Sequence, residues 1–306
     1  MTSGTNRLMI RQSTRSSAEA RRAKEDKRQT SVRRRSIGEL WRMIGIVSVL
    51  SVAAPAQAGE RESALDFRVN VYADLPVIAV SGALWAVPSA MDASNSLDMC
   101  APTCDPQDVN SWDRRVIPNH SSGAKRASDV LVVSLPLQAL WLVIGDGLHL
   151  GAEDAVADTL ILTEVLAVSN ALNQLVKSAV ERPRPYMYRE DDGSGLRKDN
   201  ADDYRSFYSM HTNTVFAVLT GTAVIFSLRY PSHPFKWFLW TAALAGGATV
   251  AALRVLAGKH FFTDVITGAV TGIASGIAIP ASHLRRRPKP LPVEIAPSGL
   301  GVAGSF

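Results

Sequence analysis

Lys236-Trp-Phe-Leu-Trp-Thr-Ala-Ala-Leu-Ala-Gly-Gly-Ala-Thr-Val-Ala-Ala-Leu-Arg-Val-Leu-Ala257 is the stretch of this chain that decides its fold. It is long enough to cross a bilayer as a helix and carries charge only near its ends. The segment 262–284 has the same composition, rich in Ala, Gly, Val and Ile. Small residues in both segments would let helix backbones approach closely: Gly246, Gly247, Gly268 and Gly272. The two segments predict membrane-spanning helices.

Further apolar segments precede these two, at 74–90, 128–147, 155–178 and 212–229. The segment 155–178 is interrupted by five polar residues, Asp158, Glu164, Asn170, Asn173 and Gln174. They could face the interior of a bundle, or they could belong to a helix of a soluble protein. No internal repeat is present. The pattern predicts an all-α helical bundle with five or six transmembrane helices.

The basic character of the chain belongs to its N-terminal segment. The 306 residues carry a formal net charge of +5, but residues 1–42 contain 12 Lys/Arg and 4 Asp/Glu, a net +8, which leaves −3 for the rest. This distribution does not indicate a nucleic-acid-binding surface. Basic residues precede the apolar run 43–54, and Ala56-Gln-Ala58 offers a cleavage site before Gly59. Residues 1–58 therefore predict a signal peptide; an uncleaved anchor and a buried core helix are the alternatives.

Residues 59–127 are expected to form an N-terminal helix and an exposed loop that contains both cysteines of the chain, Cys100 and Cys104. In an exported protein two neighbouring cysteines indicate a local disulfide. A pair of free thiols is the alternative, and no further Cys or His lies nearby in sequence to suggest a metal site. Residues 128–284 form the predicted catalytic bundle, and the basic, proline-rich residues 285–306 are expected to be a disordered tail.

Three polar segments lie between the apolar ones and together suit phosphate chemistry. The first is Lys177-Ser-Ala-Val-Glu-Arg-Pro-Arg184-Pro185, the second Ser206-Phe-Tyr-Ser209-Met-His211, and the third Arg254-Val-Leu-Ala-Gly-Lys-His260-Phe-Phe-Thr-Asp264. Phosphoester cleavage needs cations for the equatorial oxygens, an in-line nucleophile and a proton for the leaving oxygen. The three segments contain each of these groups. Residues 186–205, between the first two, are predicted to form an exposed flap over the site.

Individual roles follow from residue chemistry. Lys177 and Arg184 would pair with phosphate oxygens, because prolines end the helix and let Arg184 turn back toward the same oxygens. Ser209 suits the N-cap of a helix over 212–229, where free amides bind anions. His260 and Asp264, at i and i+4, would meet on one helix face, so that Asp264 accepts a proton from one ring nitrogen and leaves the other free to attack phosphorus.

The three segments resemble the signature of the type 2 phosphatidic acid phosphatase superfamily: Lys-x6-Arg-Pro, Pro-Ser-Gly-His and Ser-Arg-x5-His-x3-Asp. The resemblance extends over about 128–284. It implies that His260 forms a phosphohistidine and that Asp264 orients it. It also implies that His211 acts as acid and then base, with no metal or cofactor. The same resemblance implies that four residues bind the phosphoryl group: Lys177, Arg184, Ser209 and Arg254.

The chain departs from this signature at three positions, where Tyr208 replaces Pro, Met210 replaces Gly and Leu253 replaces Ser. Glycine lets its amide approach phosphate closely. The Met210 amide is still expected to contact phosphate, with its side chain directed away from the pocket; alternatively the side chain narrows the range of substrates.

The leading hypothesis is a membrane phosphatase of a lipid phosphomonoester or pyrophosphate. The alternatives are a secreted soluble acid phosphatase, a vanadate-dependent haloperoxidase and a catalytically inactive membrane scaffold. The sequence does not indicate the lipid or the oligomeric state.

The order of the segments also predicts an orientation. The ends of 155–178 and 236–257 that carry the catalytic segments fall on one membrane face, and Arg285-Arg286-Arg287 predicts that the tail on the other face is cytoplasmic. The site is then expected to face outward. A cleaved signal requires an odd number of spans, which would make 74–90 an interfacial or re-entrant helix. If residues 1–58 stay cytoplasmic, all six segments span.

Overall fold

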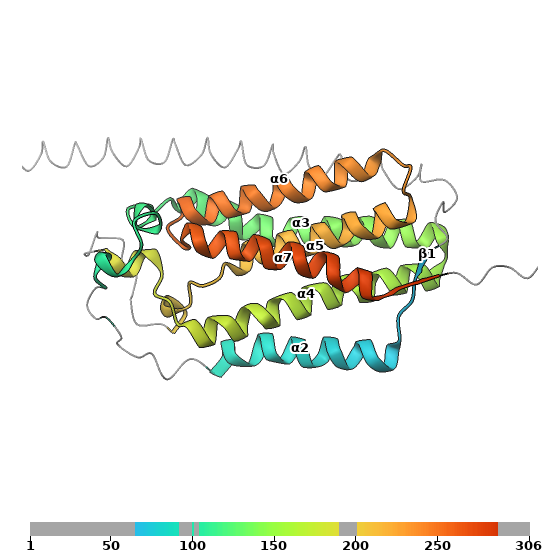
Figure 1. Ribbon diagram of the computed structural model, residues 1–306, viewed down its shortest axis with the longest axis horizontal. Coiled ribbons are helices and arrows are strands. Elements are labelled where there is room, and N and C mark those ends of the chain that lie inside the picture. Colours follow the sequence, from blue (N-terminus) through green and yellow to red (C-terminus); the bar gives the residue numbers. More distant parts are fainter. Residues whose placement is uncertain (1–64, 92–99, 101–103, 190–200, 287–306) are drawn as a thin grey trace, which may run out of the picture.

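The computed structural model describes residues 65–91, 100, 104–189 and 201–286. The basic N-terminal segment, the proposed signal and the tail beyond residue 286 lie outside the described residues. Six long helices lie side by side along the long axis of the molecule (Figure 1). They are α2 (Val71–Met91), α3 (Ser122–Leu150), α4 (Ala152–Val180), α5 (Met210–Arg229), α6 (Phe235–Leu256) and α7 (Phe262–Ser282). The prediction of an all-α bundle is confirmed.

Helices α3 to α7 are long and apolar enough to cross a membrane, and α2 is apolar over the shorter stretch Val71–Ala86. Many large apolar side chains on these helices are exposed, among them Leu137, Trp141, Trp237 and Val270. A soluble protein rarely exposes so much apolar surface, whereas lipid would cover it. The protein is therefore a multi-pass membrane protein, and this surface does not favour a soluble acid phosphatase.

Helix α5 forms the centre of the bundle and is buried along most of its length, with α7 packed closely against it. A Cβ added to Gly268, Gly272 or Gly276 of α7 would lie only 2.5–2.7 Å from backbone carbonyl oxygens of α5. The predicted close approach at Gly268 and Gly272 is thus confirmed. This packing fixes the start of α5 next to the start of α7, where two of the catalytic segments lie.

The polar residues of α4 face the interior. Asn173 Nδ2 donates to the carbonyl oxygen of Tyr208 at 2.8 Å, and Asn170 Oδ1 accepts from Thr214 at 2.9 Å. Asp158 is fully buried and forms an ion pair with Arg229 of α5. Of the two interpretations of this segment, the structure agrees with the one in which its polar residues face the bundle interior. There they find partners, without which a buried polar group would be costly in an apolar medium.

Helix α2 lies alongside α4 and runs parallel to the bundle (Figure 1). Of the alternatives expected for 74–90, this is the orientation of a helix aligned with the other five and not that of an interfacial helix. One feature of the ends of the described chain was not expected. The short strand β1 (Leu65–Phe67) pairs antiparallel with β2 (Leu284–Arg286), so that Leu65 lies opposite Arg286. The prediction of a disordered tail over 285–306 was therefore wrong for residues 285 and 286, which belong to β2. The apolar side chain of Phe67 is buried against the bundle and anchors this strand pair.

Candidate active site

The three catalytic segments meet at one end of the bundle. Lys177 and Arg254 lie in the last turns of α4 and α6, while His211 and Asp264 lie in the first turns of α5 and α7. Because α4 and α6 run antiparallel to α5 and α7, the ends of the first two helices lie beside the starts of the other two. Burial lowers the pKa of the His260 imidazole, and Arg184, Arg254 and Lys177 lie close enough to lower this pKa further. The structure thus brings together the residues that the sequence predicts to handle phosphate.

His260 lies in the turn between α6 and α7, not on a helix. Its Nδ1 is 2.8 Å from the carbonyl oxygen of Ser206 and 3.6 Å from Asp264 Oδ2. The predicted direct hydrogen bond to Asp264 on a shared helix face was therefore wrong. The turn directs the ring toward the Ser206 carbonyl, and only Asp264 belongs to helix α7.

The Ser206 contact fixes the tautomer of His260. A carbonyl oxygen can only accept, so Nδ1 carries the hydrogen and Nε2 is left with its lone pair. Nε2 lies 3.4 Å from Arg184 Nη1. Burial lowers the pKa of His260 well below 6.5, and the charges of Arg184, Arg254 and Lys177 lower this pKa further. The shift favours the neutral imidazole, whose Nε2 lone pair is then available.

Asp264 acts on His260 through Ser206. Its Oδ2 accepts from Ser206 Oγ at 2.5 Å and from the Phe261 backbone N–H at 2.9 Å, while Oδ1 accepts from Arg182 at 2.6 Å. Ser206 therefore contacts the histidine with its carbonyl and the carboxylate with its hydroxyl. Sequence reasoning assigned no role to Ser206, although it opens the second segment.

Arg182 is a second residue that sequence reasoning missed, although it stands two positions before Arg184. Its guanidinium donates to Asp264, to Asp113 at 2.9 Å and to Thr263 Oγ1 at 2.7 Å, and it covers the Phe261 ring. Burial alone would raise the pKa of Asp113, but hydrogen bonds from Thr263, Arg182 and Asn110 lower it below 3.8. Arg182 thus ties the loop that contains Asp113 to the first turn of α7.

The Arg184 guanidinium donates hydrogen bonds to Asp202, which precedes the second segment, and to Lys259 in the third segment. Its Nε donates to the Asp202 carbonyl oxygen at 2.7 Å, Nη2 to Asp202 Oδ1 at 2.6 Å, and Nη1 to the Lys259 carbonyl oxygen at 3.2 Å. The prediction that all of 186–205 forms an exposed flap was wrong at its ends. Residues 185–188 are buried in a short 3-10 helix, where aromatic side chains pack beside the site, and 190–200 lie outside the described residues.

Arg254 and His211 share a carboxylate that the sequence motifs do not contain. Asp129 Oδ1, in the first turns of α3, lies 3.1 Å from Arg254 Nη1 and 3.0 Å from His211 Nε2. The Nε atom of Arg254 is buried and has no hydrogen-bond partner among the described residues. Nothing in the spacing of the three segments could identify Asp129, because it comes from an element outside them.

Ser209 is the N-cap of α5, as predicted. Its Oγ accepts from Thr212 Oγ1 at 3.1 Å, which leaves its own hydrogen free to donate, and its backbone N–H donates to the Asp264 carbonyl oxygen at 3.1 Å. Met210 is the first residue of α5 and is partly exposed. Tyr208 is buried.

Cys100 and Cys104 are joined by a disulfide. The backbone N–H of Cys104 donates to the Met187 carbonyl oxygen at 3.0 Å, and Cys104 is buried in the cluster that contains Phe261, the neighbour of His260. The cysteine loop therefore lies at the same end of the bundle as the catalytic segments.

Comparison with known proteins gives one family. Residues 158–288 match the model of the PAP2 superfamily, which confirms the resemblance over that segment. No curated protein matches the chain. The solved structure of a transmembrane PAP2-type phosphatidylglycerolphosphate phosphatase from Bacillus subtilis aligns with a TM-score of 0.43 and 18% identity. The alignment covers 69% of this chain and 96% of that chain.

Proposed function

We propose that this chain, whose residues 158–288 match the model of the PAP2 superfamily, hydrolyses a lipid phosphomonoester or pyrophosphate at the membrane face. One observation carries the proposal. The unprotonated Nε2 of His260 lies among Lys177, Arg184 and Arg254 at one end of helices that are long enough to cross a bilayer. A phosphate attached to a membrane lipid would reach such a site without leaving the bilayer.

In the first step the phosphoryl group binds between the cations. Arg184 and Arg254 each offer a planar fork for two oxygens, and Lys177 adds a point charge. The buried, unpartnered Nε of Arg254 supports this role, since a phosphate oxygen would satisfy it. Ser209 would donate its free hydroxyl hydrogen, and the Met210 amide at the start of α5 would donate to the same anion.

The phosphoryl group is then transferred twice, first to His260 and then to water. His260 Nε2 attacks phosphorus, the bond from phosphorus to the leaving oxygen breaks, and His211 protonates that oxygen. His211 next takes a proton from water, the hydroxide attacks the phosphohistidine, and inorganic phosphate leaves with the imidazole restored. Asp264 positions His260 through Ser206 and balances the charge that develops on the ring.

Two carboxylates stand where they would compete with the substrate. Asp129 bonds Arg254 and His211, and Asp202 bonds Arg184. Each satisfies a cation that phosphate would need, so substrate binding must displace at least part of these contacts. Asp202 is well exposed and can move into water; Asp129 can keep its bond to His211 and orient that ring toward the leaving oxygen.

The test is phosphate release from dioleoyl phosphatidic acid, an isoprenyl pyrophosphate and p-nitrophenyl phosphate by the purified chain in detergent. Activity is expected with EDTA present, and vanadate, which mimics pentavalent phosphorus, should inhibit it. Activity that disappears with EDTA and returns with magnesium would contradict this mechanism. Inactivity on every phosphoester would instead favour an inactive scaffold.

The roles of the two histidines can be separated with labelled substrate. His260→Ala should abolish turnover and the acid-labile phosphoenzyme, because no other group replaces the nucleophile. His211→Ala should still trap label from p-nitrophenyl phosphate, whose leaving group needs little protonation. Trapping in His260→Ala but not in His211→Ala would reverse the assignment.

The proposed site faces outward. The disulfide between Cys100 and Cys104 lies at the site end and suits an oxidising compartment, while Arg285 and Arg286 at the other end favour the cytoplasm. A membrane-impermeant thiol reagent should label intact cells only after reduction. Labelling that needs permeabilisation but no reductant would place the site in the cytoplasm.

A further inference from the structure

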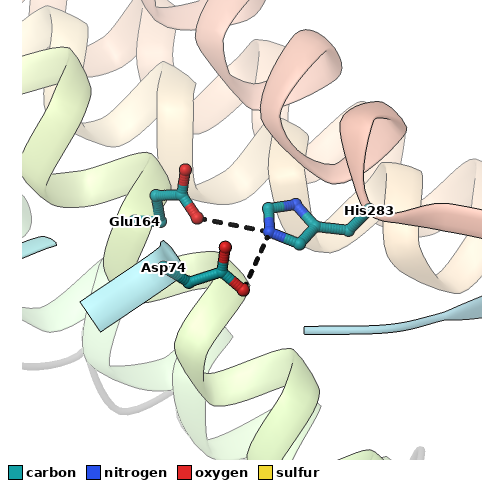
Figure 2. A group of neighbouring side chains, drawn as sticks. All are labelled: Asp74, Glu164 and His283. Atoms are coloured by element: carbon teal, nitrogen blue, oxygen red, sulfur yellow. Dashed lines mark ion pairs between the residues drawn. The ribbon is translucent and has the colours of Figure 1, made fainter. Parts of the chain in front are cut away.

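Far from the catalytic segments, three helices contribute one polar cluster (Figure 2). Asp74 lies in the first turn of α2, Glu164 in α4, and His283 at the C-cap of α7. His283 Nε2 is 3.5 Å from Asp74 Oδ2 and 3.3 Å from Glu164 Oε2, and the three atoms lie within 4.8 Å of one another. All three side chains are at least 87% buried.

The hydrogen bonds around His283 determine what its Nε2 can do. Nδ1 lies 2.9 Å from the Ile279 carbonyl oxygen, which can only accept, so Nδ1 carries a hydrogen. A neutral His283 then directs a lone pair at two carboxylates. Glu164 Oε2 is buried and accepts no hydrogen bond from the described residues. Three electron-rich atoms therefore face one another, of which Asp74 Oδ2 also accepts the Asn70 backbone N–H at 2.7 Å. A proton or a metal ion between them would relieve their repulsion.

The distances favour a metal ion over a proton. A charge-assisted N–H···O hydrogen bond is about 2.7–2.9 Å long, shorter than either distance here. Ligands about 2.0–2.2 Å from a tetrahedral ion are about 3.3–3.6 Å apart, which matches both distances from His283 Nε2. The two carboxylate oxygens lie within 4.8 Å of each other and would move closer together to share the ion. The bond from Nδ1 to a backbone carbonyl is also the contact that metal-binding histidines usually make.

We propose that Asp74, Glu164 and His283 bind a divalent transition-metal ion, with zinc the best match to one imidazole and two carboxylates. The ion would carry the charge that two carboxylates require at a buried site. A fourth position would remain for water or for a second carboxylate oxygen.

The site would have a structural role. It joins the start of α2 to α4 and to the end of α7, next to the point where Arg68 N–H donates to the His283 carbonyl oxygen at 3.0 Å. Metal binding would therefore attach the N-terminal helix to the bundle that carries the catalytic residues. The inference does not depend on the proposed phosphatase activity, because the cluster shares no residue with the catalytic segments.

The experiment uses the full-length chain in detergent, stripped with EDTA and then titrated with zinc chloride. Wild type is expected to bind one equivalent, measured by mass spectrometry of the metal, and to gain several degrees in Tm. Magnesium should have little effect. Glu164→Gln and His283→Gln should each lose the bound zinc and the gain in Tm, whereas His149→Gln, an exposed histidine on α3, should keep both.

X-ray absorption at the zinc edge on wild type tests the site even if the variants fold poorly. It should show one nitrogen and two or three oxygen ligands at about 2.0–2.2 Å, and no sulfur. Zinc that stays bound in both variants would place it elsewhere, for example at the catalytic histidines, and would overturn the proposal. So would a wild-type Tm that zinc does not change, which would leave a protonated His283 between the carboxylates.

Discussion

The backbone carbonyl of Ser206 accepts the Nδ1 hydrogen of His260 at 2.8 Å. This contact joins the second catalytic segment to the third, because Ser206 also donates its hydroxyl hydrogen to Asp264 at 2.5 Å. The His260 ring is thus oriented by a main-chain carbonyl, and the Asp264 carboxylate holds the residue that provides this carbonyl.

Ser206→Ala should lower kcat by about 10-fold to 100-fold with little change in KM. It removes a buried hydrogen bond to a charged group, an interaction of about 1.5–3 kcal/mol, and loosens the carbonyl that holds His260. Steady-state kinetics on p-nitrophenyl phosphate measures this. Ser275→Ala on α7 removes a hydroxyl that bonds only its own helix and should leave kcat unchanged. Equal kcat values for the two variants would contradict a positioning role for Ser206.

Asp129→Asn should lower both KM and kcat, for two different reasons. Loss of the charge frees Arg254 for phosphate and should lower KM, and the inhibition constant for vanadate, several-fold. Loss of the oriented His211 contact should lower kcat about 10-fold or more for a lipid phosphate, and less for p-nitrophenyl phosphate. Asp108→Asn, on the exposed part of the cysteine loop, is the control. If kcat falls equally for both substrates, Asp129 does not act through the leaving-group acid.

Gly272→Ala should lower Tm by about 5 °C and reduce activity. The added Cβ would meet the Asn213 carbonyl oxygen at 2.5 Å, and backbone cannot move aside without separating α5 from α7. Overpacking of this kind costs about 1–3 kcal/mol, and each kcal/mol shifts Tm by about 2–4 °C. Gly82→Ala on α2, where nothing lies within 4 Å of the new Cβ, should leave Tm unchanged or slightly raised. Similar losses in both variants would show that the close contact at Gly272 is not responsible.

Acidification should destabilise wild type more than His260→Asn. The pKa of His260 is lowered well below 6.5 in the folded chain. Below pH 6.5 the unfolded chain therefore binds a proton that the folded chain excludes, so stability is lost as pH falls through this window. At pH 5.5 the effect is on the order of 1 kcal/mol, or about 2–4 °C in Tm relative to pH 7.5. Equal losses in the two proteins would mean that the buried imidazole is protonated.

Met210→Gly restores the residue of the resembled signature at the first position of α5. We expect retained activity on the best substrate, a broader range of head groups, and a modest loss of Tm from added backbone freedom. A panel of lipid and soluble phosphoesters measures the range. A wild type that is inactive throughout, but gains activity on this change, would identify the native chain as a degenerate enzyme.

The long helices and most of the site could be predicted from sequence because both depend on local patterns. Apolar segments gave the helices to within a few residues, except at 128–147, which lies inside the longer helix 122–150. Motif spacing indicated Lys177, Arg184, His211 and His260, because each lies at a helix end or in the turn that follows it.

The remaining contacts depend on tertiary geometry. Asp129 comes from a helix outside the motifs, and Ser206 contributes a backbone carbonyl whose direction no side-chain pattern encodes. His260 and Asp264 were expected on one helix, yet α7 begins only at Phe262. The four-residue spacing of His260 and Asp264 therefore crosses the turn before α7 and does not lie within a helix. The short strands were missed because three residues carry too little periodicity to be recognised.

The pairing of Leu65 with Arg286 also sets the parity of the whole chain. Two segments hydrogen-bonded to each other occupy the same side of a membrane, so the chain between them crosses it an even number of times or not at all. Five helices are long and apolar enough to span, and α2, which is apolar over a shorter stretch, lies parallel to them. If α2 is counted as a sixth span, the number is even, as the pairing requires. Residue 65 and the basic residues after α7 are then in one compartment, and the catalytic end is in the other. If Arg285 and Arg286 are cytoplasmic, the segment before residue 65 is retained as a cytoplasmic extension; if that segment is cleaved outside, the catalytic end is cytoplasmic. Locating either terminus by protease protection would therefore assign a compartment to every loop.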